Sequence, residues 1–155
     1  MGIGLLIPQN LQIPVEGATA DDWNAKTFWY HPWGRSGTHK GVDIFAKKGT
    51  PVRAATGGWV LRANTGELGG VSAWVLGPKW RLHYYAHLDT RAVSSGDWVW
   101  QGELIGTVGD TGNAKGKPAH LHYTLATLLP YSWRADDDPQ GWKKIFILNP
   151  LDYFP

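Results

Sequence analysis

The sequence contains no cysteine, which excludes disulfides, thiolate zinc sites and a thiol nucleophile. It has no apolar run near the roughly 18 residues that a membrane-spanning helix needs. Residues 1–8 have neither the basic start nor the apolar length of a signal peptide. The net charge is only +2, without the clustered Lys and Arg of a nucleic-acid-binding protein. Membrane-spanning, thiol-dependent and nucleic-acid-binding classes are therefore excluded.

Two hydrolase motifs are also missing. There is no Gly-x-Ser-x-Gly turn to hold a serine nucleophile and no His-Glu-x-x-His helix to bind zinc. The Asp run at 136–138 has no surrounding acidic ligand spacing, so a solvated turn is the better interpretation. Any hydrolytic site must therefore use other residues.

Turn-forming residues and tryptophan are abundant: 20 Gly, 10 Pro and 10 Trp in 155 residues. This composition favours short strands joined by tight turns, in one domain of ordinary size. We predict strands at 51–55, 58–63, 71–76, 80–87, 98–100, 104–108 and 120–126, with a closing strand near 145–148. The sequence thus predicts a mainly β fold, and we assign Trp59, Trp74 and Trp98 to its core because tryptophan is usually buried.

The most informative stretch is His120-Leu121-His122. On a strand the two histidines point to the same side, with Cα atoms about 6.6 Å apart, while Leu121 points to the other side. Imidazole binds metals and titrates near neutral pH, so such a pair can serve one site. Taken alone, the motif is weak, because a His-x-His pair arises by chance in many chains of this composition.

A second group, His39-x3-Asp43, strengthens the interpretation. In an extended chain these two residues share a side but lie about 13 Å apart at Cα, which is far for two ligands of one ion. We expect Gly41 to close this distance by a bend, through a positive φ or a bulge.

Together these motifs resemble those of the lysostaphin/LytM-type zinc endopeptidases, the M23 family, which cut peptide bonds in bacterial peptidoglycan. The matching signatures are His39-x3-Asp43, Tyr85-Ala86-His87-Leu88 and His120-Leu121-His122, in that family's order. The segments 48–52, 58–60, 102–106 and 109–113 also follow its pattern. The resemblance covers residues 32–126, and several ordered motifs over such a length are far more specific than any one of them.

The resemblance implies roles for individual residues. One zinc ion per chain would be held by His39, Asp43 and His122, leaving an open position for water, as in catalytic zinc sites. His120 would act as general base on the zinc-bound water that attacks the scissile carbonyl. His87 would donate a hydrogen bond to the oxyanion or to the leaving amine.

It also implies an architecture: one β-rich domain, 1–155, around an antiparallel sheet, with zinc at the floor of an open groove. Within it we expect an N-terminal wrapping segment (1–31), a motif-bearing core (32–126) and a loop with a closing strand (127–155). Tyr30 is a weaker candidate for substrate contact, because it precedes the first motif where family members often carry such a side chain. His83 is expected to support the strand and His31 has no assigned role.

The implied function is zinc-dependent endopeptidase cleavage of peptidoglycan stem or cross-bridge peptides. Two alternatives stay open: a non-catalytic peptidoglycan-binding or amidase-activating module of the same fold, and a carboxypeptidase or amidase acting on the same polymer. The presence of His39, Asp43, His87, His120 and His122 favours an active enzyme. No residue in the sequence indicates whether the bond cut is D-Ala–diaminopimelate or Gly-Gly. We expect a periplasmic or extracellular protein whose leader has been removed.

Overall fold

The computed structural model describes residues 9–155, which form a mainly β fold around one antiparallel sheet. Its strands are β1 (Val42–Phe45), β2 (Pro51–Arg53), β3 (Gly58–Gly66), β4 (Gly70–Leu76), β5 (Arg81–Arg91), β6 (Trp98–Val99), β7 (Leu104–Val108), β8 (His120–Thr127) and β9 (Ile147–Leu148). The predicted mainly β fold is confirmed, and the predicted strands lie within a few residues of the observed ones.

All helical segments in the described part of the chain are short 3-10 turns. They are η2 (Ala20–Asp22), η3 (Ala25–Thr27), η4 (Gly34–Ser36), η5 (Pro78–Trp80), η6 (Gly112–Ala114), η7 (Ser132–Arg134), η8 (Gly141–Ile145) and η9 (Pro150–Asp152). None of the described helices is long and apolar enough to cross a membrane.

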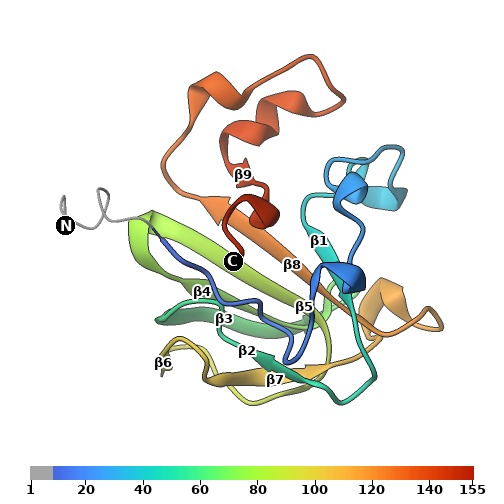
Figure 1. The fold of residues 1–155 in the computed structure, drawn as a ribbon, viewed down its shortest axis with the longest axis vertical. Coiled ribbons are helices and arrows are strands. Elements are labelled where there is room, and N and C mark those ends of the chain that lie inside the picture. Colours follow the sequence, from blue (N-terminus) through green and yellow to red (C-terminus); the bar gives the residue numbers. More distant parts are fainter. Residues whose placement is uncertain (1–8) are drawn as a thin grey trace.

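The main path through the sheet runs β1-β8-β5-β4-β3-β6, with β7 bridging β2 and β5, and β9 beside β8 (Figure 1). Strand β8 therefore lies between β1 and β5. Its register pairs His122 with Asp43 on one side and with Ala86 on the other. This position brings residues from three distant parts of the sequence to one place.

Alternation along β8 decides which side chains face the core. Leu121, Tyr123 and Leu125 are fully buried on one side, whereas His120 and His122 share the opposite side, as their spacing predicts. The core continues through Ile44 on β1 and Tyr85 on β5. The histidine-bearing side of β8 is thus backed by a rigid apolar layer.

One part of the sequence interpretation is wrong. Trp59 and Trp98 were assigned to the core, but their side chains are 57% and 43% exposed. The strands alternate as expected, yet the residues that point inward are the neighbours Val60 and Val99, each only 1% exposed. Trp74 is half-buried and stacks on Tyr84, with ring centroids 4.2 Å apart.

Candidate metal centre

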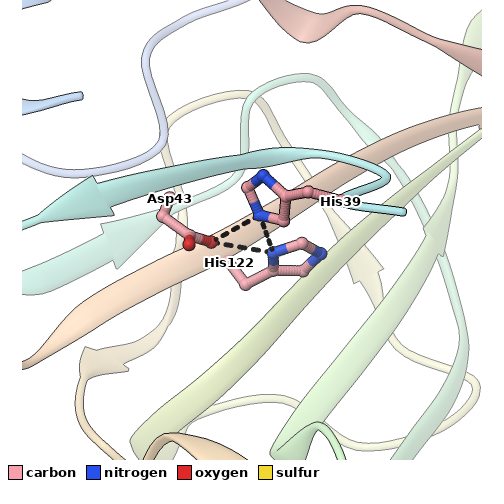
Figure 2. A group of neighbouring side chains, drawn as sticks. All are labelled: His39, Asp43 and His122. Carbon is pink, nitrogen blue, oxygen red and sulfur yellow. Dashed lines mark hydrogen bonds and ion pairs between the residues drawn. The ribbon is translucent and has the colours of Figure 1, made fainter. Parts of the chain in front are cut away.

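Three side chains converge where β1 meets β8: His39 just before β1, Asp43 within it, and His122 on β8 (Figure 2). His39 Nε2 lies 3.1 Å from Asp43 Oδ1 and 3.3 Å from His122 Nδ1. His122 Nδ1 lies 2.9 Å from the same Asp43 oxygen. The three potential ligand atoms thus form a nearly equilateral triangle.

This triangle, with edges of 2.9–3.3 Å, is slightly smaller than the one that a tetrahedral zinc ion requires. Ligand atoms about 2.0–2.1 Å from zinc at tetrahedral angles lie roughly 3.3–3.4 Å from one another. Two imidazole nitrogens and a carboxylate oxygen turned toward a common point also repel unless a cation or shared protons lie among them. Within residues 9–155, no other group of three His, Cys, Asp or Glu residues brings ligand atoms within 4.8 Å of one another. The donor set therefore fits a zinc ion.

Hydrogen bonds behind the two histidines fix which nitrogen faces the centre. His39 Nδ1 donates to the Thr27 carbonyl at 2.9 Å, which leaves the Nε2 lone pair pointing inward. The Thr124 hydroxyl donates to the Lys40 carbonyl at 2.9 Å, so it accepts from His122 Nε2 at 3.0 Å. Such outer partners set the tautomer and raise the basicity of ligating histidines.

The charge states also suit a cation. Burial alone raises the pKa of Asp43, but in the metal-free chain the protons that His122 and His39 can share with its carboxylate outweigh burial and hold this pKa well below its usual value. Burial lowers the pKa of His122, so its imidazole is neutral at pH 7. The ionised Asp43 carboxylate gives the centre a negative charge, which attracts a divalent ion.

Gly41 forms a bend just before β1, as predicted, but by a different backbone geometry. It has no positive φ, and the β1–β8 register contains no bulge. A Cβ at this position would lie 2.4 Å from the Tyr123 carbonyl oxygen and 2.9 Å from Thr124 Oγ1. The glycine is therefore needed for close packing of the chain against β8. His39 precedes β1 and is not part of that strand, which allows its side chain to lie beside Asp43.

Two further histidines border the centre. His120 Nδ1 donates to the Pro118 carbonyl at 2.9 Å, and its Nε2 lies 3.8 Å from Asp43 Oδ1. His87 Nδ1 donates to the Thr111 carbonyl at 2.8 Å. The two rings meet edge to face with centroids 5.1 Å apart. In their neutral forms both therefore present an Nε2 lone pair beside the three-residue centre.

His87 also has an unusual backbone. Its φ of 62° places a non-glycine residue in the left-handed region, which costs about 1 kcal/mol or more. A hydrogen bond from its N–H to the Gly69 carbonyl, 2.7 Å long, helps to hold this conformation. Burial lowers the pKa of His87 to about 4, so the ring is neutral at pH 7.

Comparison with known proteins identifies the chain's relatives. The model of the family described as "Peptidase family M23" matches residues 37–132, which include all five of these residues. The chain belongs to peptidase family M23. Its resemblance to that family, inferred from the motifs, is thereby confirmed.

Characterised M23 relatives are similar over the same region. The chain is 37% identical over 94 residues to the peptidoglycan DD-endopeptidase ShyC of Vibrio cholerae, covering 60% of this chain and 21% of that protein. It is 36% identical over 124 residues to the glycyl-glycine endopeptidase ALE-1 of Staphylococcus capitis, covering 77% and 33%. The chain thus spans a fifth to a third of the length of these relatives.

Solved M23 structures agree with the fold. The catalytic domain of the antimicrobial peptidase lysostaphin from Staphylococcus simulans superposes with a TM-score of 0.66 at 26% identity. The match covers 82% of this chain and 87% of that domain. The antiparallel, lysostaphin-like architecture expected from the motifs is confirmed.

In this M23 chain a cleft of about 700 Å³ opens over the metal centre. Its lining includes Asp43, His87, His120 and His122, whereas His39 is 1% exposed and lies beneath it. The cleft therefore gives a substrate access to one side of the centre.

Sequence reasoning missed several residues that line this cleft. Trp33 stacks on His39, with centroids 4.2 Å apart, and so covers one candidate ligand. Tyr30 is not part of the lining; its ring is 55% exposed and meets Trp33 edge to face. Tyr84 also lines the cleft, on the side of β5 opposite His83. Regular alternation would place Tyr84 on the side of β5 opposite His87, yet both line the cleft in the structure, where His87 has a positive φ.

Proposed function

We propose that the chain is a zinc-dependent endopeptidase that hydrolyses peptides of bacterial peptidoglycan. The observation that carries this proposal is the triangle of ligand atoms, each histidine fixed from behind by a hydrogen bond that directs its free nitrogen inward. Three protein ligands leave a position open, as in catalytic zinc sites and unlike the closed four-ligand structural ones.

A bound zinc ion would polarise the scissile carbonyl and acidify a water molecule. Removing the proton from that water is assigned to His120. Its Nε2 carries a lone pair, because Nδ1 is committed to Pro118, and lies only 3.8 Å from the carboxylate oxygen of Asp43. Asp43 then stabilises the imidazolium that forms, which is the electrostatic role of a carboxylate beside a general base.

His87 is assigned the second proton position. Because its Nδ1 proton is held by the Thr111 carbonyl, Nε2 is the atom available to the substrate. In the neutral ring this atom accepts a hydrogen bond, so it orients the attacking water. After receiving the second proton of that water, the same atom donates to the oxyanion or to the leaving amine, which refines the donor role inferred from the motifs.

The cleft favours peptides that carry negative charge. Its described lining contains the cationic residues Arg35 and Lys117, while the only carboxylate there, that of Asp43, faces the metal centre. Peptidoglycan stem peptides carry free carboxylates, whereas glycine bridges do not. Because the relatives ShyC and ALE-1 are named for different bonds, the bond cut by this chain is to be read from its products. A periplasmic or extracellular location follows from the polymer.

The test is mass spectrometry of fragments released from purified, cross-linked peptidoglycan. It compares untreated protein, protein treated with a chelator, and chelated protein with zinc restored. We expect cleavage in the first and third samples only, with fragment masses that identify the bond. Intact cross-links in a sample shown to contain one zinc per chain would contradict the proposal and favour a non-catalytic module. Release of only a terminal residue or of whole stem peptides would indicate a carboxypeptidase or amidase.

A further inference from the structure

A second cleft, of about 430 Å³, is separated from the metal centre by the width of the sheet. The residues that line this cleft belong to β3, β6 and η5 or lie next to them. Strands β3 and β6 end the sheet path that begins with β1 and β8 (Figure 1). Its lining includes Trp59, Trp80, Trp98 and Trp100. We call this site the tryptophan cleft.

The four indoles are unusually exposed for tryptophan. Their exposed fractions are 57% for Trp59, 38% for Trp80, 43% for Trp98 and 66% for Trp100. Single exposed apolar side chains are ordinary, but a contiguous group of large ones marks a binding surface. Since the alternate residues Val60 and Val99 already fill the core, these tryptophans are not needed there.

The sheet holds the rings at fixed angles. Trp59 and Trp98 are register partners on β3 and β6, with ring centroids 5.1 Å apart at 81°. Trp100, two residues beyond Trp98, lies 5.4 Å from it at 75°. Because the rings meet edge to face, indole faces remain free to contact a ligand.

Charge and size restrict what can bind. Among the described residues, the lining has one ammonium group, that of Lys79, and no carboxylate. This favours a neutral ligand over a strongly charged one. The lining comprises ten residues, whereas a stable protein interface uses roughly 20–30 residues a side. The cleft volume is within the roughly 300–1,000 Å³ typical of small-ligand sites.

We propose that the tryptophan cleft binds the glycan strand of the polymer whose peptides the metal centre cleaves. The identity of the polymer rests on the proposed function. A pyranose ring presents a face of C–H groups that packs against the electron-rich face of an indole, while its hydroxyls stay in water. The N-acetylglucosamine units of this strand are uncharged, as the lining favours. Separate sites for sugar and peptide raise the local concentration of peptides at the metal centre.

The test separates glycan binding from hydrolysis. Intrinsic tryptophan fluorescence is titrated with a soluble N-acetylglucosamine tetramer and with glycan strands stripped of peptides. The variants are Trp59→Ala/Trp98→Ala and, in case that double variant fails to fold, Trp100→Ala alone. Trp142→Ala is the control, because Trp142 is 62% exposed and lies outside the cleft. Thermal unfolding verifies that each variant is folded.

We expect both glycan probes to shift the fluorescence of the unmodified protein and of the control. Affinity should fall at least about tenfold in the cleft variants. Cleavage of dilute polymer should slow in those variants, whereas cleavage of a short soluble peptide should be unchanged.

Unaltered fluorescence, or equal glycan affinity in all variants, would overturn the proposal. Self-association that depends on these tryptophans would also overturn it, because a second copy of the chain would then occupy the cleft. Glycan binding that occurs only after residues 1–8 are deleted would overturn it as well, because the chain's own segment would then be the occupant. Peptide hydrolysis without glycan binding would refute this inference alone. Glycan binding without hydrolysis would refute the proposed function alone.

Discussion

At the scale of single residues, the metal centre depends on pairs of side chains that look equivalent in the sequence. His120 and His122 are two positions apart on one strand, yet only His122 turns a nitrogen toward both His39 and Asp43. His120 instead donates a hydrogen bond from Nδ1 to the Pro118 carbonyl. We therefore propose different roles for these two histidines, because their hydrogen-bond partners differ: the Thr124 hydroxyl for His122 and the Pro118 carbonyl for His120.

This difference gives the first prediction. His122→Ala should lose both zinc and peptidase activity, because two ligands do not retain the ion. His120→Ala should keep about one zinc per chain and lose roughly 100-fold or more in kcat, the usual contribution of a general base. Zinc analysis of the purified variants, together with peptide hydrolysis, measures both. Full zinc occupancy in His122→Ala would refute the ligand assignment.

The second prediction concerns the partner behind His122. Thr124→Val removes the hydroxyl that accepts from His122 Nε2 while keeping the side-chain shape. Zinc affinity should fall about 10- to 100-fold, as for other outer partners of metal-bound histidines. Thr90→Val is a matched control, since Thr90 is exposed and bonds to Thr107 instead. Equal zinc affinity in the two variants, measured by competition with a chromogenic chelator, would show that Thr124 does not tune the site.

At the scale of elements, the pairing of β1 with β8 depends on Gly41. A Cβ there meets the Tyr123 carbonyl, which belongs to the β8 backbone and cannot rotate away. The close fit of these two strands sets the distance from Asp43 to His122.

We therefore predict that Gly41→Ala destabilises the fold by about 1–3 kcal/mol, the usual cost of overpacking, and weakens zinc binding. Gly66→Ala is the control, because a Cβ at Gly66 would meet no heavy atom within 4 Å and this glycine has no positive φ. Denaturant unfolding with and without zinc measures both effects. A Gly41→Ala protein as stable as the Gly66→Ala protein would contradict the packing argument.

Most strand positions and a histidine-based metal site could be predicted from the sequence. Alternation along a strand places His120 and His122 on the same side, and this does not depend on the rest of the fold. The contacts behind them could not. Thr27 and Thr124 are ordinary residues until the chain path brings their oxygens to His39 and His122. Likewise, exposure of Trp59 is decided by which side of β3 the core occupies, and tryptophan content carries no such information.

At the scale of the whole molecule, stability depends on a buried histidine outside the metal centre. His83 is fully buried; its Nδ1 lies 2.5 Å from the Tyr123 hydroxyl, and its Nε2 has no hydrogen-bond partner among residues 9–155. Burial lowers the pKa of His83 to about 3, against about 6.5 in an unfolded chain. The folded state therefore needs this imidazole to be neutral.

The consequence is acid lability. Between pH 6.5 and 3 the unfolded chain binds a proton at His83 that the folded chain does not, so stability falls as pH decreases through this window. The loss attributable to His83 approaches about 1.4 kcal/mol per pH unit. His83→Phe should flatten the decline between about pH 6 and 4, whereas His31→Gln, at an exposed position, should not. Unfolding free energies at several pH values measure this, and parallel curves for all three proteins would refute it.

The position of β8 between β1 and β5 has a consequence for biosynthesis. Ribosomes make the chain from the N-terminus at about 5–20 residues per second, so His39 and Asp43 exist for several seconds before His122 does. During that interval the sheet lacks a strand on its main path, and the proposed zinc site lacks its third ligand. Metal can be held only after nearly all of the sheet has formed. The proposed three-residue zinc site therefore cannot form before β8 has paired with β1.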